Sequence, residues 1–181
     1  MRAVDAARGV IAGVAVLGLV TGCSGGGLGG SEPGTPTAAE AEMDNLLDPC
    51  TDIPDEWLIE TGLDPSTERN IVNPAEASSW RICGWEPAEF SYRMDLLSTS
   101  HTIDEARANP DLVILRDITV GGRQGIVSKD GFAGARSCYV SLPATQGMFE
   151  IAVEWFGDRP AEAQCDLAIK HGTDLEPHLP K

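Results

Sequence analysis

The sequence predicts one α+β domain in two layers, a mainly antiparallel sheet with helices on one face and two disulfides. Three observations support this prediction. Alternation of apolar and polar residues, which is typical of strands, recurs across the second half of the chain at hairpin-length spacing. Helical segments stand before, between and after groups of strands, whereas a doubly wound nucleotide-binding fold needs strands and helices to alternate throughout. Four cysteines follow an export signal, and disulfides persist outside the cytoplasm.

The first 22 residues have the features of a lipoprotein signal peptide. Arg2 and Arg8 flank the start, residues 9–20 carry no charge, and Val-Thr-Gly-Cys occupies positions 20–23. A membrane-spanning helix needs about 20 apolar residues, so the uncharged run is too short to be one. These last four residues resemble a bacterial lipobox, in which the cysteine is lipidated and cleavage occurs just before it. Cys23 is therefore the predicted lipidation site.

The remaining chain divides into a tether and a domain. Residues 23–43 form a predicted flexible tether of Gly, Ser, Pro and Thr, and residues 44–181 form the predicted extracytoplasmic α+β domain. The whole chain has 13 basic and 28 acidic residues, a net charge of -15. Because such a chain repels a phosphate backbone, nucleic acid is excluded as an expected partner. We expect the protein at the cell membrane, lipid-anchored on the extracytoplasmic side.

Three helices are predicted, over residues 55–60, 102–108 and 160–172. Pro54 fits the first turn of the first helix, where two acids suit the positive helix end. Thr102 and Glu105 have the spacing of a capping box that opens the second helix. Gly172 is the predicted end of the third helix.

Six strands are predicted, over residues 80–85, 90–96, 112–120, 124–128, 137–142 and 148–156. Gly121 and Gly122 between the third and fourth strands indicate a hairpin. The second, fifth and sixth strands alternate regularly, so one face should pack under helices while the other faces water. The packed set is Phe90, Tyr92, Met94, Leu96, Cys138, Val140, Leu142, Phe149, Ile151, Val153 and Trp155. The open face combines mixed charge with an aromatic ring, and its candidate binding residues are Arg93, Tyr139, Glu150 and Glu154. A merely solvated face would have a similar composition.

With Cys23 set aside, the chain has an even number of cysteines, which favours two disulfides. Their separations of 33, 55 and 27 residues do not suit a zinc site, which usually draws on tight pairs, and no C-x-x-C redox motif is present. Four cysteines allow three connectivities, and the sequence does not choose among them. We predict the sequential pairing, because it fastens each end of the domain to the sheet: Cys50 with Cys83, and Cys138 with Cys165.

Several short motifs occur in a fixed order behind the lipobox: Asp48-Pro49-Cys50, Cys83-Gly84-Trp85, the Gly121-Gly122 hairpin and Ser137-Cys138-Tyr139-Val140. With these motifs the chain resembles an actinobacterial (mycobacterial and nocardial-type) family of cell-envelope lipoproteins, known only as a domain of unknown function (3558). The resemblance covers about residues 46–172. It implies a cell-envelope location and a disulfide-linked α+β domain, and it supplies no catalytic residue.

No catalytic residue, metal or cofactor is predicted. The chain has three histidines and lacks the H-E-x-x-H, G-x-S-x-G and S-x-x-K motifs. A hydrolase site would have to combine Ser98 or Ser100 with His101 and Asp104, which neighbours along an extended strand end cannot do without a special turn. His171 is expected at the end of the last helix, where a cation suits the negative dipole end.

Other polar and aromatic residues also have simple explanations. Acidic residues near the domain start lack the loop pattern of a calcium site and predict a solvated surface. Glu150 and Glu154 lie about 13 Å apart along one strand, beyond the roughly 5 to 9.5 Å that glycosidases use. The tryptophans fill the core or stack on a carbohydrate or lipid, and the sequence does not separate these roles for Trp57, Trp80, Trp85 and Trp155.

The expected function is a lipid-anchored binding, adaptor or sensor module at the cell envelope, without catalytic activity. Its partner is an unidentified envelope protein or ligand. Two alternatives stay open, an envelope hydrolase with an unrecognised Ser/His/Asp site and a lipid or glycolipid carrier. A large apolar cavity would favour the carrier. A Ser or Asp within hydrogen-bond reach of His101 or His171 in a cleft would favour the hydrolase.

Replacing Cys23 with Ala removes the thiol that forms the thioether to the lipid. We expect the Cys23→Ala chain to leave the membrane fraction and to lack the mass of the lipid, because the anchor depends on buried acyl chains. Membrane fractionation and intact mass measurement of both chains test this. An unchanged distribution and mass would contradict the lipoprotein prediction.

Overall fold

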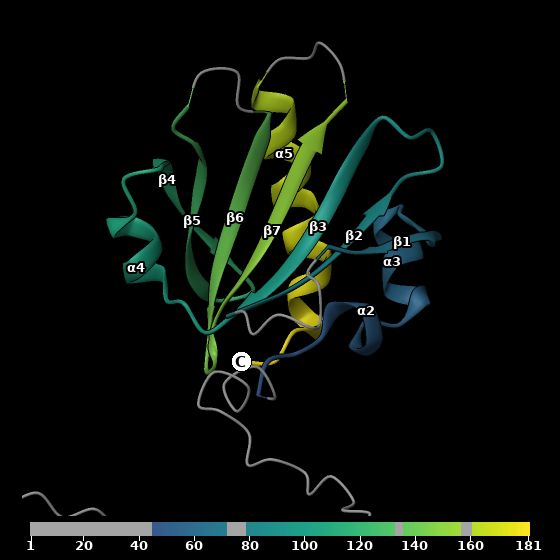
Figure 1. Cartoon of the computed structure of the whole chain (residues 1–181), viewed down its shortest axis with the longest axis horizontal. Coiled ribbons are helices and arrows are strands. Elements are labelled where there is room, and N and C mark those ends of the chain that lie inside the picture. Colours follow the sequence, from purple (N-terminus) through teal and green to yellow (C-terminus); the bar gives the residue numbers. More distant parts are fainter. Residues whose placement is uncertain (1–44, 72–78, 133–135, 157–160) are drawn as a thin grey trace, which may run out of the picture. The chain divides into compact units, whose positions relative to one another are not determined.

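The computed structural model describes residues 45–71, 79–132, 136–156 and 161–181 (Figure 1). The predicted signal peptide, Cys23 and the predicted tether lie outside these ranges. None of the described helices is both long and apolar enough to cross a membrane. In chain order the described elements are α2 (Pro49–Asp52), α3 (Asp55–Thr61), β1 (Asp64–Asn70), β2 (Trp80–Glu86), β3 (Tyr92–Thr99), α4 (Ile103–Ala108), β4 (Leu112–Val120), β5 (Arg123–Asp130), β6 (Ser137–Ala144), β7 (Gly147–Trp155), α5 (Ala161–Leu175) and the 3-10 helix η1 (Glu176–His178).

Seven strands form one antiparallel sheet in the order β1-β2-β3-β7-β6-β5-β4, which confirms the predicted α+β class. β1 to β3 form one meander, β4 to β7 form another, and the pairing of β3 with β7 joins them. Because β4 lies at the far edge, the chain must pass β7, β6 and β5 after leaving β3. Residues 100–111, which contain α4, make this passage. They are called the crossing connection below.

The two faces of the sheet are covered differently. α5 packs on β6 and β7, and the residues of α3 join the same core (Figure 1). α4 lies on the opposite face, where Ala106 packs with Ile126 and Met148 in a second, smaller cluster. α4 is therefore an exception to the prediction that the helices share one face. Since α5 occupies one side of the sheet, the crossing connection uses the other.

The α5 face carries the main hydrophobic core, and the predicted alternation in β3, β6 and β7 is confirmed. Ten side chains of these strands are buried there: Tyr92, Met94, Leu96, Cys138, Val140, Leu142, Phe149, Ile151, Val153 and Trp155. Burial of each large apolar side chain contributes about 1.5–3 kcal/mol. The prediction for Phe90 is wrong, because this residue precedes β3, has a φ of 50° and is 58% exposed.

Both predicted disulfides are present. Cys50 of α2 is bonded to Cys83 of β2, and Cys138 of β6 is bonded to Cys165 of α5, with S–S distances of 2.06 and 2.04 Å. Each bond joins a helix to the sheet. Closing loops of this length restricts the unfolded chain and contributes roughly 3 to 4 kcal/mol per bond.

β1 is a strand that the sequence pattern does not predict. It pairs with β2 along one side, and its register is irregular between Asp64 and Arg69. All seven of its residues are exposed or partly buried and none is a large apolar residue, so the strand shows no alternation of apolar and polar types. An edge strand of this polarity leaves no periodic signal in the sequence.

α5 continues to Leu175, three residues beyond the predicted end at Gly172. Gly172 lies where the helix meets the sheet, and a Cβ added there would be 3.4 Å from Cγ1 of Val140. The glycine therefore allows close packing of helix on sheet and does not end the helix. Tertiary packing outweighs the low helix propensity of glycine here.

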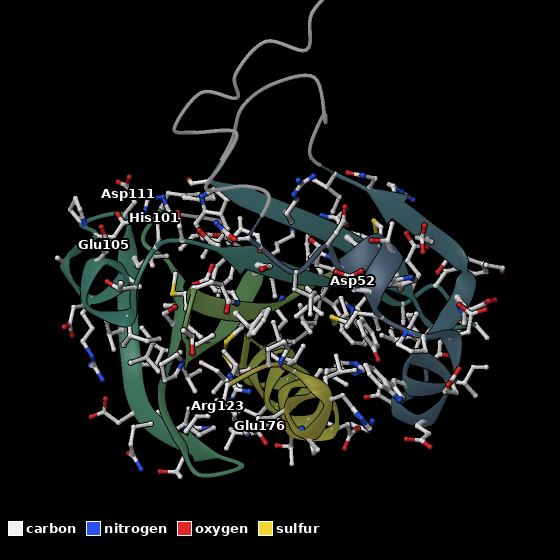
Figure 2. The ribbon with its side chains drawn as sticks, turned by 90° about the horizontal axis from the view of Figure 1, so that it is seen from below. Asp52, His101, Glu105, Asp111, Arg123 and Glu176 are labelled. Carbon is white, nitrogen blue, oxygen red and sulfur yellow. A yellow bond between two sulfur atoms is a disulfide. The ribbon has the colours of Figure 1, made fainter. Side chains whose placement is uncertain are left out.

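A buried ion pair holds the C-terminal residues against the sheet. Nε of Arg123 donates to Oε1 of Glu176 at 2.8 Å, and both side chains are buried (Figure 2). The other guanidinium nitrogens donate to the backbone carbonyls of Pro143, Leu179 and Pro180. Gly121, in the confirmed hairpin turn, has a φ of 55°, and a Cβ there would lie 1.6 Å from Oε2 of Glu176. This glycine serves the turn and also leaves room for the carboxylate.

The longer α5 places His171 in the core, so the predicted position at a helix end is wrong. Its Nδ1 lies 2.7 Å from Oγ1 of Thr61, and its Nε2 lies 2.8 Å from the hydroxyl of Tyr92. Because Thr61 donates its own proton to Asp174, its oxygen accepts from Nδ1–H, and Tyr92 donates to Nε2. Both ring nitrogens are satisfied in the neutral form, and burial lowers the pKa of His171 to about 4.

His171 should make the fold less stable in mild acid. Its folded-state pKa of about 4 lies below the ordinary 6.5, so the unfolded chain takes up the proton first as the pH falls between these values. We expect the free energy of unfolding to fall by about 3 kcal/mol across this window. A His171→Gln chain should lack this part of the dependence, whereas the control His178→Gln should keep it. Urea unfolding at several pH values tests this, and parallel curves for all three chains would contradict it.

Candidate functional site

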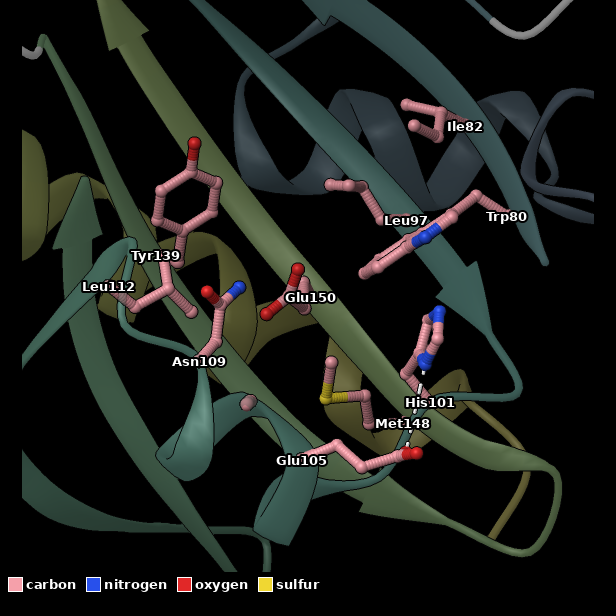
Figure 3. A pocket seen from close by; sticks show the side chains of 11 residues that line it. Trp80, Ile82, Leu97, His101, Glu105, Asn109, Leu112, Tyr139, Met148 and Glu150 are labelled. Atoms are coloured by element: carbon pink, nitrogen blue, oxygen red, sulfur yellow. Dashed lines mark ion pairs between the residues drawn. The ribbon is translucent and has the colours of Figure 1, made fainter. Parts of the chain in front are cut away.

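A pocket of about 660 Å³ opens on the face of the sheet opposite α5 (Figure 3). Pockets of about 300–1,000 Å³ accept small ligands. The strands form the base of this pocket, and the crossing connection forms one side. The lining residues are Trp80, Ile82, Leu97, His101, Glu105, Ala106, Asn109, Leu112, Tyr139, Met148 and Glu150.

Local interactions fix α4 beside the pocket. The backbone N–H of Glu105 donates to the Thr102 hydroxyl, and the Glu105 carboxylate accepts from the Thr102 N–H, so the predicted capping box is confirmed. Arg107 forms an ion pair with Asp117 of β4. Ala106 is buried against the sheet. With these contacts the helix holds its place over the strands, and the pocket is a formed feature of the fold.

Glu150 of β7 lies in the centre of the pocket (Figure 3). Its register partners are Leu97 of β3 and Ser141 of β6, and the Ser141 hydroxyl donates to Oε1 of Glu150 at 2.7 Å. The residue is only 6% exposed. The prediction of an open, solvent-facing Glu150 is therefore wrong, because the crossing connection covers this part of the sheet. Burial raises the pKa of the Glu150 carboxyl group above its ordinary value.

Apolar side chains flank Glu150. Figure 3 shows Trp80, Ile82 and Leu97 on one side and Tyr139 with Leu112 on the other. The Tyr139 hydroxyl donates to the Asp130 carboxylate at 3.1 Å, and burial raises the pKa of this phenol. Tyr139 thus presents mainly its ring to the pocket, since its hydroxyl is already engaged.

His101 lies at one end of the pocket. Its Nε2 is 3.0 Å from the hydroxyl of Ser79, and its Nδ1 is 3.7 Å from Oε2 of Glu105. Its ring packs beside that of Trp80, with centroids 5.5 Å apart. The Glu105 carboxylate is held mainly by the backbone and hydroxyl of Thr102, and these hydrogen bonds lower its pKa.

The hydrolase residues that the sequence offered, Ser98, Ser100 and Asp104, form no side-chain hydrogen bond or ion pair with His101. Ser98 is fully buried on the α5 face of β3, and its hydroxyl has no hydrogen-bond partner among the described residues. Asp104 is exposed on α4, and the carboxylate near His101 belongs to Glu105. The serine that reaches His101 is Ser79, which is 22 positions away along the chain. No local motif signals this pair, because the pairing of β2 with β3 brings it together.

The other predicted binding-face residues lie on the same face as the pocket but outside its lining. Arg93 donates to Asp95 and to Glu154, with N–O distances of 2.8 Å in both ion pairs. The guanidinium of Arg93 is therefore engaged by two carboxylates within the protein. The candidate binding face therefore divides into an internally paired charge cluster of Arg93, Asp95 and Glu154, and a pocket that contains Tyr139 and Glu150.

The four tryptophans have different environments. Trp85 and Trp155 are buried in the main core. Trp57 is partly buried and stacks on the ring of His178, with centroids 4.2 Å apart. Trp80 is the tryptophan that lines the pocket. Trp57 also packs against the main core, whereas Trp80 packs against the second cluster and lines the pocket.

One group of potential metal ligands occurs among the described residues, formed by Cys50, Glu68 and Cys83. Its two cysteines form the first disulfide, so they offer no thiolate to a metal. This group does not constitute a metal site in the oxidised protein.

Comparison with known proteins identifies a family model, described as Protein of unknown function (DUF3558), that matches residues 18–178. No curated protein and no solved structure gives a match. The description of the family assigns no activity or ligand.

Proposed function

This chain belongs to the DUF3558 family, and from that starting point we propose that it is a lipid-anchored extracytoplasmic module that binds a small ligand in the pocket around Glu150. One observation carries the proposal: a carboxyl group that is 6% exposed lies in the centre of a cavity of about 660 Å³ with apolar sides. Ligand sites typically combine apolar walls with a few placed polar groups and a perturbed pKa.

The envelope location rests on the sequence. The lipobox-like motif ends at Cys23, and residues 23–43 have the composition of a flexible tether. A flexible segment of this length has a root-mean-square reach of roughly 25 Å, which holds a domain clear of the lipid head groups. The ligand is then a molecule that reaches the outer side of the membrane.

A protein-adaptor surface has less support than the pocket. On the open face, Arg93 is paired with both Asp95 and Glu154. A partner would have to break these pairs to use their charges, which costs free energy. The pocket, in contrast, offers a buried polar group and apolar surface together.

Filling the pocket should abolish ligand binding. Leu97→Trp adds bulk on the pocket face of β3, away from the main core. We expect native mass spectrometry of the full chain, purified from its own membrane, to show a non-covalent small molecule that Leu97→Trp loses. Leu115→Trp makes the same change at an exposed position on β4 and should keep the ligand. No small molecule on the unmodified chain, or equal amounts on both variants, would contradict the proposal.

A second candidate, an ester hydrolase, is favoured by the contact between Ser79 and His101. In such a reaction His101 takes the Ser79 proton while the serine oxygen bonds to the acyl carbon; the leaving alcohol then takes this proton, and water releases the acyl group. The Glu105 carboxylate, 3.7 Å from His101 and held by Thr102, lies beyond hydrogen-bond distance for the orienting role. This geometry makes the binding module the first choice.

A fluorophosphonate probe separates the two candidates, because it labels activated serines. As a binding module, the full chain should remain unlabelled and should not hydrolyse 4-nitrophenyl butyrate above the level of the Ser79→Ala variant. Labelling and hydrolysis that both disappear in Ser79→Ala, but persist in Ser66→Ala on the edge strand β1, would establish the hydrolase instead. Intact mass and absorbance at fixed protein concentration provide the measurements.

A further inference from the structure

Glu150 has no lysine or arginine partner among the described residues, and His101 is the one group whose positive charge would favour its ionised form. The hydrogen bond between Glu150 and Ser141 uses Oε1, and the described contacts leave Oε2 without a donor. No lysine or arginine lines the pocket. A carboxylate that is 6% exposed is costly to ionise without a counter-charge, so its ionised form favours any cation that can reach it.

The surrounding charges exclude an anionic ligand. The titratable groups that face Glu150 are His101 from the crossing connection, Glu105 from α4, Tyr139 from β6, and Asp130 through its hydrogen bond with Tyr139. Carboxylates outnumber the single imidazole. A phosphate or carboxylate placed here would add a negative charge to an already acidic pocket.

The rest of the pocket lining is suited to the aliphatic or aromatic part of a ligand. Trp80, Ile82 and Leu97 lie on one side of Glu150, and Leu112 and Met148 also border the cavity (Figure 3). Burial of apolar ligand surface against these side chains is favourable at about 25 cal/mol per Å². The faces of Trp80 and Tyr139 can in addition attract a cation by cation–π interaction.

We propose, building on the binding function above, that the ligand is an amphipathic cation whose ammonium group binds Glu150 and whose apolar part lies between Trp80 and Tyr139. The ammonium donates to the free Oε2 and supplies the missing positive charge. A charge-assisted hydrogen bond of this kind is stronger than one between neutral groups.

The proposal carries a definite pH dependence. Burial raises the pKa of Glu150, so a larger fraction of the carboxyl is protonated in mild acid than for an exposed glutamate. Binding of an ammonium should therefore strengthen as the pH rises and Glu150 loses its proton. The Glu150→Gln variant removes this part of the pH dependence, so comparison of the two chains isolates the contribution of Glu150.

Three probes with the same alkyl chain test the charge preference: octylammonium, octan-1-ol and octanoate. Titration of the full chain by NMR should show octylammonium binding at least about tenfold more tightly than the other two, with shifts at the indole of Trp80. Glu150→Gln should reduce the affinity for octylammonium to that for octan-1-ol. Glu154→Gln, on the same strand and face but outside the pocket lining, should leave it unchanged.

The outcomes separate this inference from the proposed function. Equal affinity for the three probes, or tighter binding of octanoate or octan-1-ol than of octylammonium, would overturn the inference that the ligand is a cation. The pocket would then still stand as a proposed ligand site. The amount of native small molecule that remains bound to Leu97→Trp tests the binding function of the pocket independently of the ligand's charge. If Glu150→Gln fails to fold, the affinity of the unmodified chain for octylammonium is compared at about pH 5 and about pH 8. Tighter binding at the higher pH is expected, and equal affinity at both values would refute the inference.

Discussion

The order of the strands is the constraint on which the rest of the structure depends. β3 ends in the middle of the sheet and β4 begins at its edge, so the chain has to pass three strands between them. One face is occupied by α5 and the main core, and the crossing connection therefore uses the other. It places a capped helix over strands whose residues on this face are both apolar, such as Ile126 and Met148, and polar, such as Glu150. This arrangement converts part of an open face into a pocket and buries Glu150 in it.

Much of this fold follows from local patterns, but the pocket does not. Alternation in β3, β6 and β7 predicts which residues share a face. The even number of cysteines predicts two disulfides, and the sequential pairing, which is favoured because it fastens each end of the domain to the sheet, is the one observed. Alternation cannot show what covers the second face, because that depends on contacts such as Ala106 with Met148, which are distant in sequence. The same limit applies to Ser79 and His101. The predicted helix end at Gly172 is wrong for a related reason, because the close approach of Gly172 to Val140 is a property of the packed structure.

Two buried titratable residues illustrate the difference between a structural group and a candidate ligand group. His171 has a partner on each ring nitrogen, and the protein holds it neutral within the core. Glu150 has one described partner for two oxygens and borders a cavity. A fully satisfied group needs nothing further, whereas a half-satisfied one keeps a desolvation cost that a ligand can relieve. The hydrogen-bond inventory, more than burial alone, distinguishes the two.

The two edge strands are both irregular. β1 has a register irregularity between Asp64 and Arg69, and β4 has one between Ile114 and Arg116. Regular sheet edges present rows of unpaired backbone groups that recruit other strands, and bulges disrupt such rows. Chains held on a membrane, as proposed here, would meet side by side at high local density. Interrupted edges of this kind disfavour the pairing of one copy's edge strand with that of a neighbouring copy.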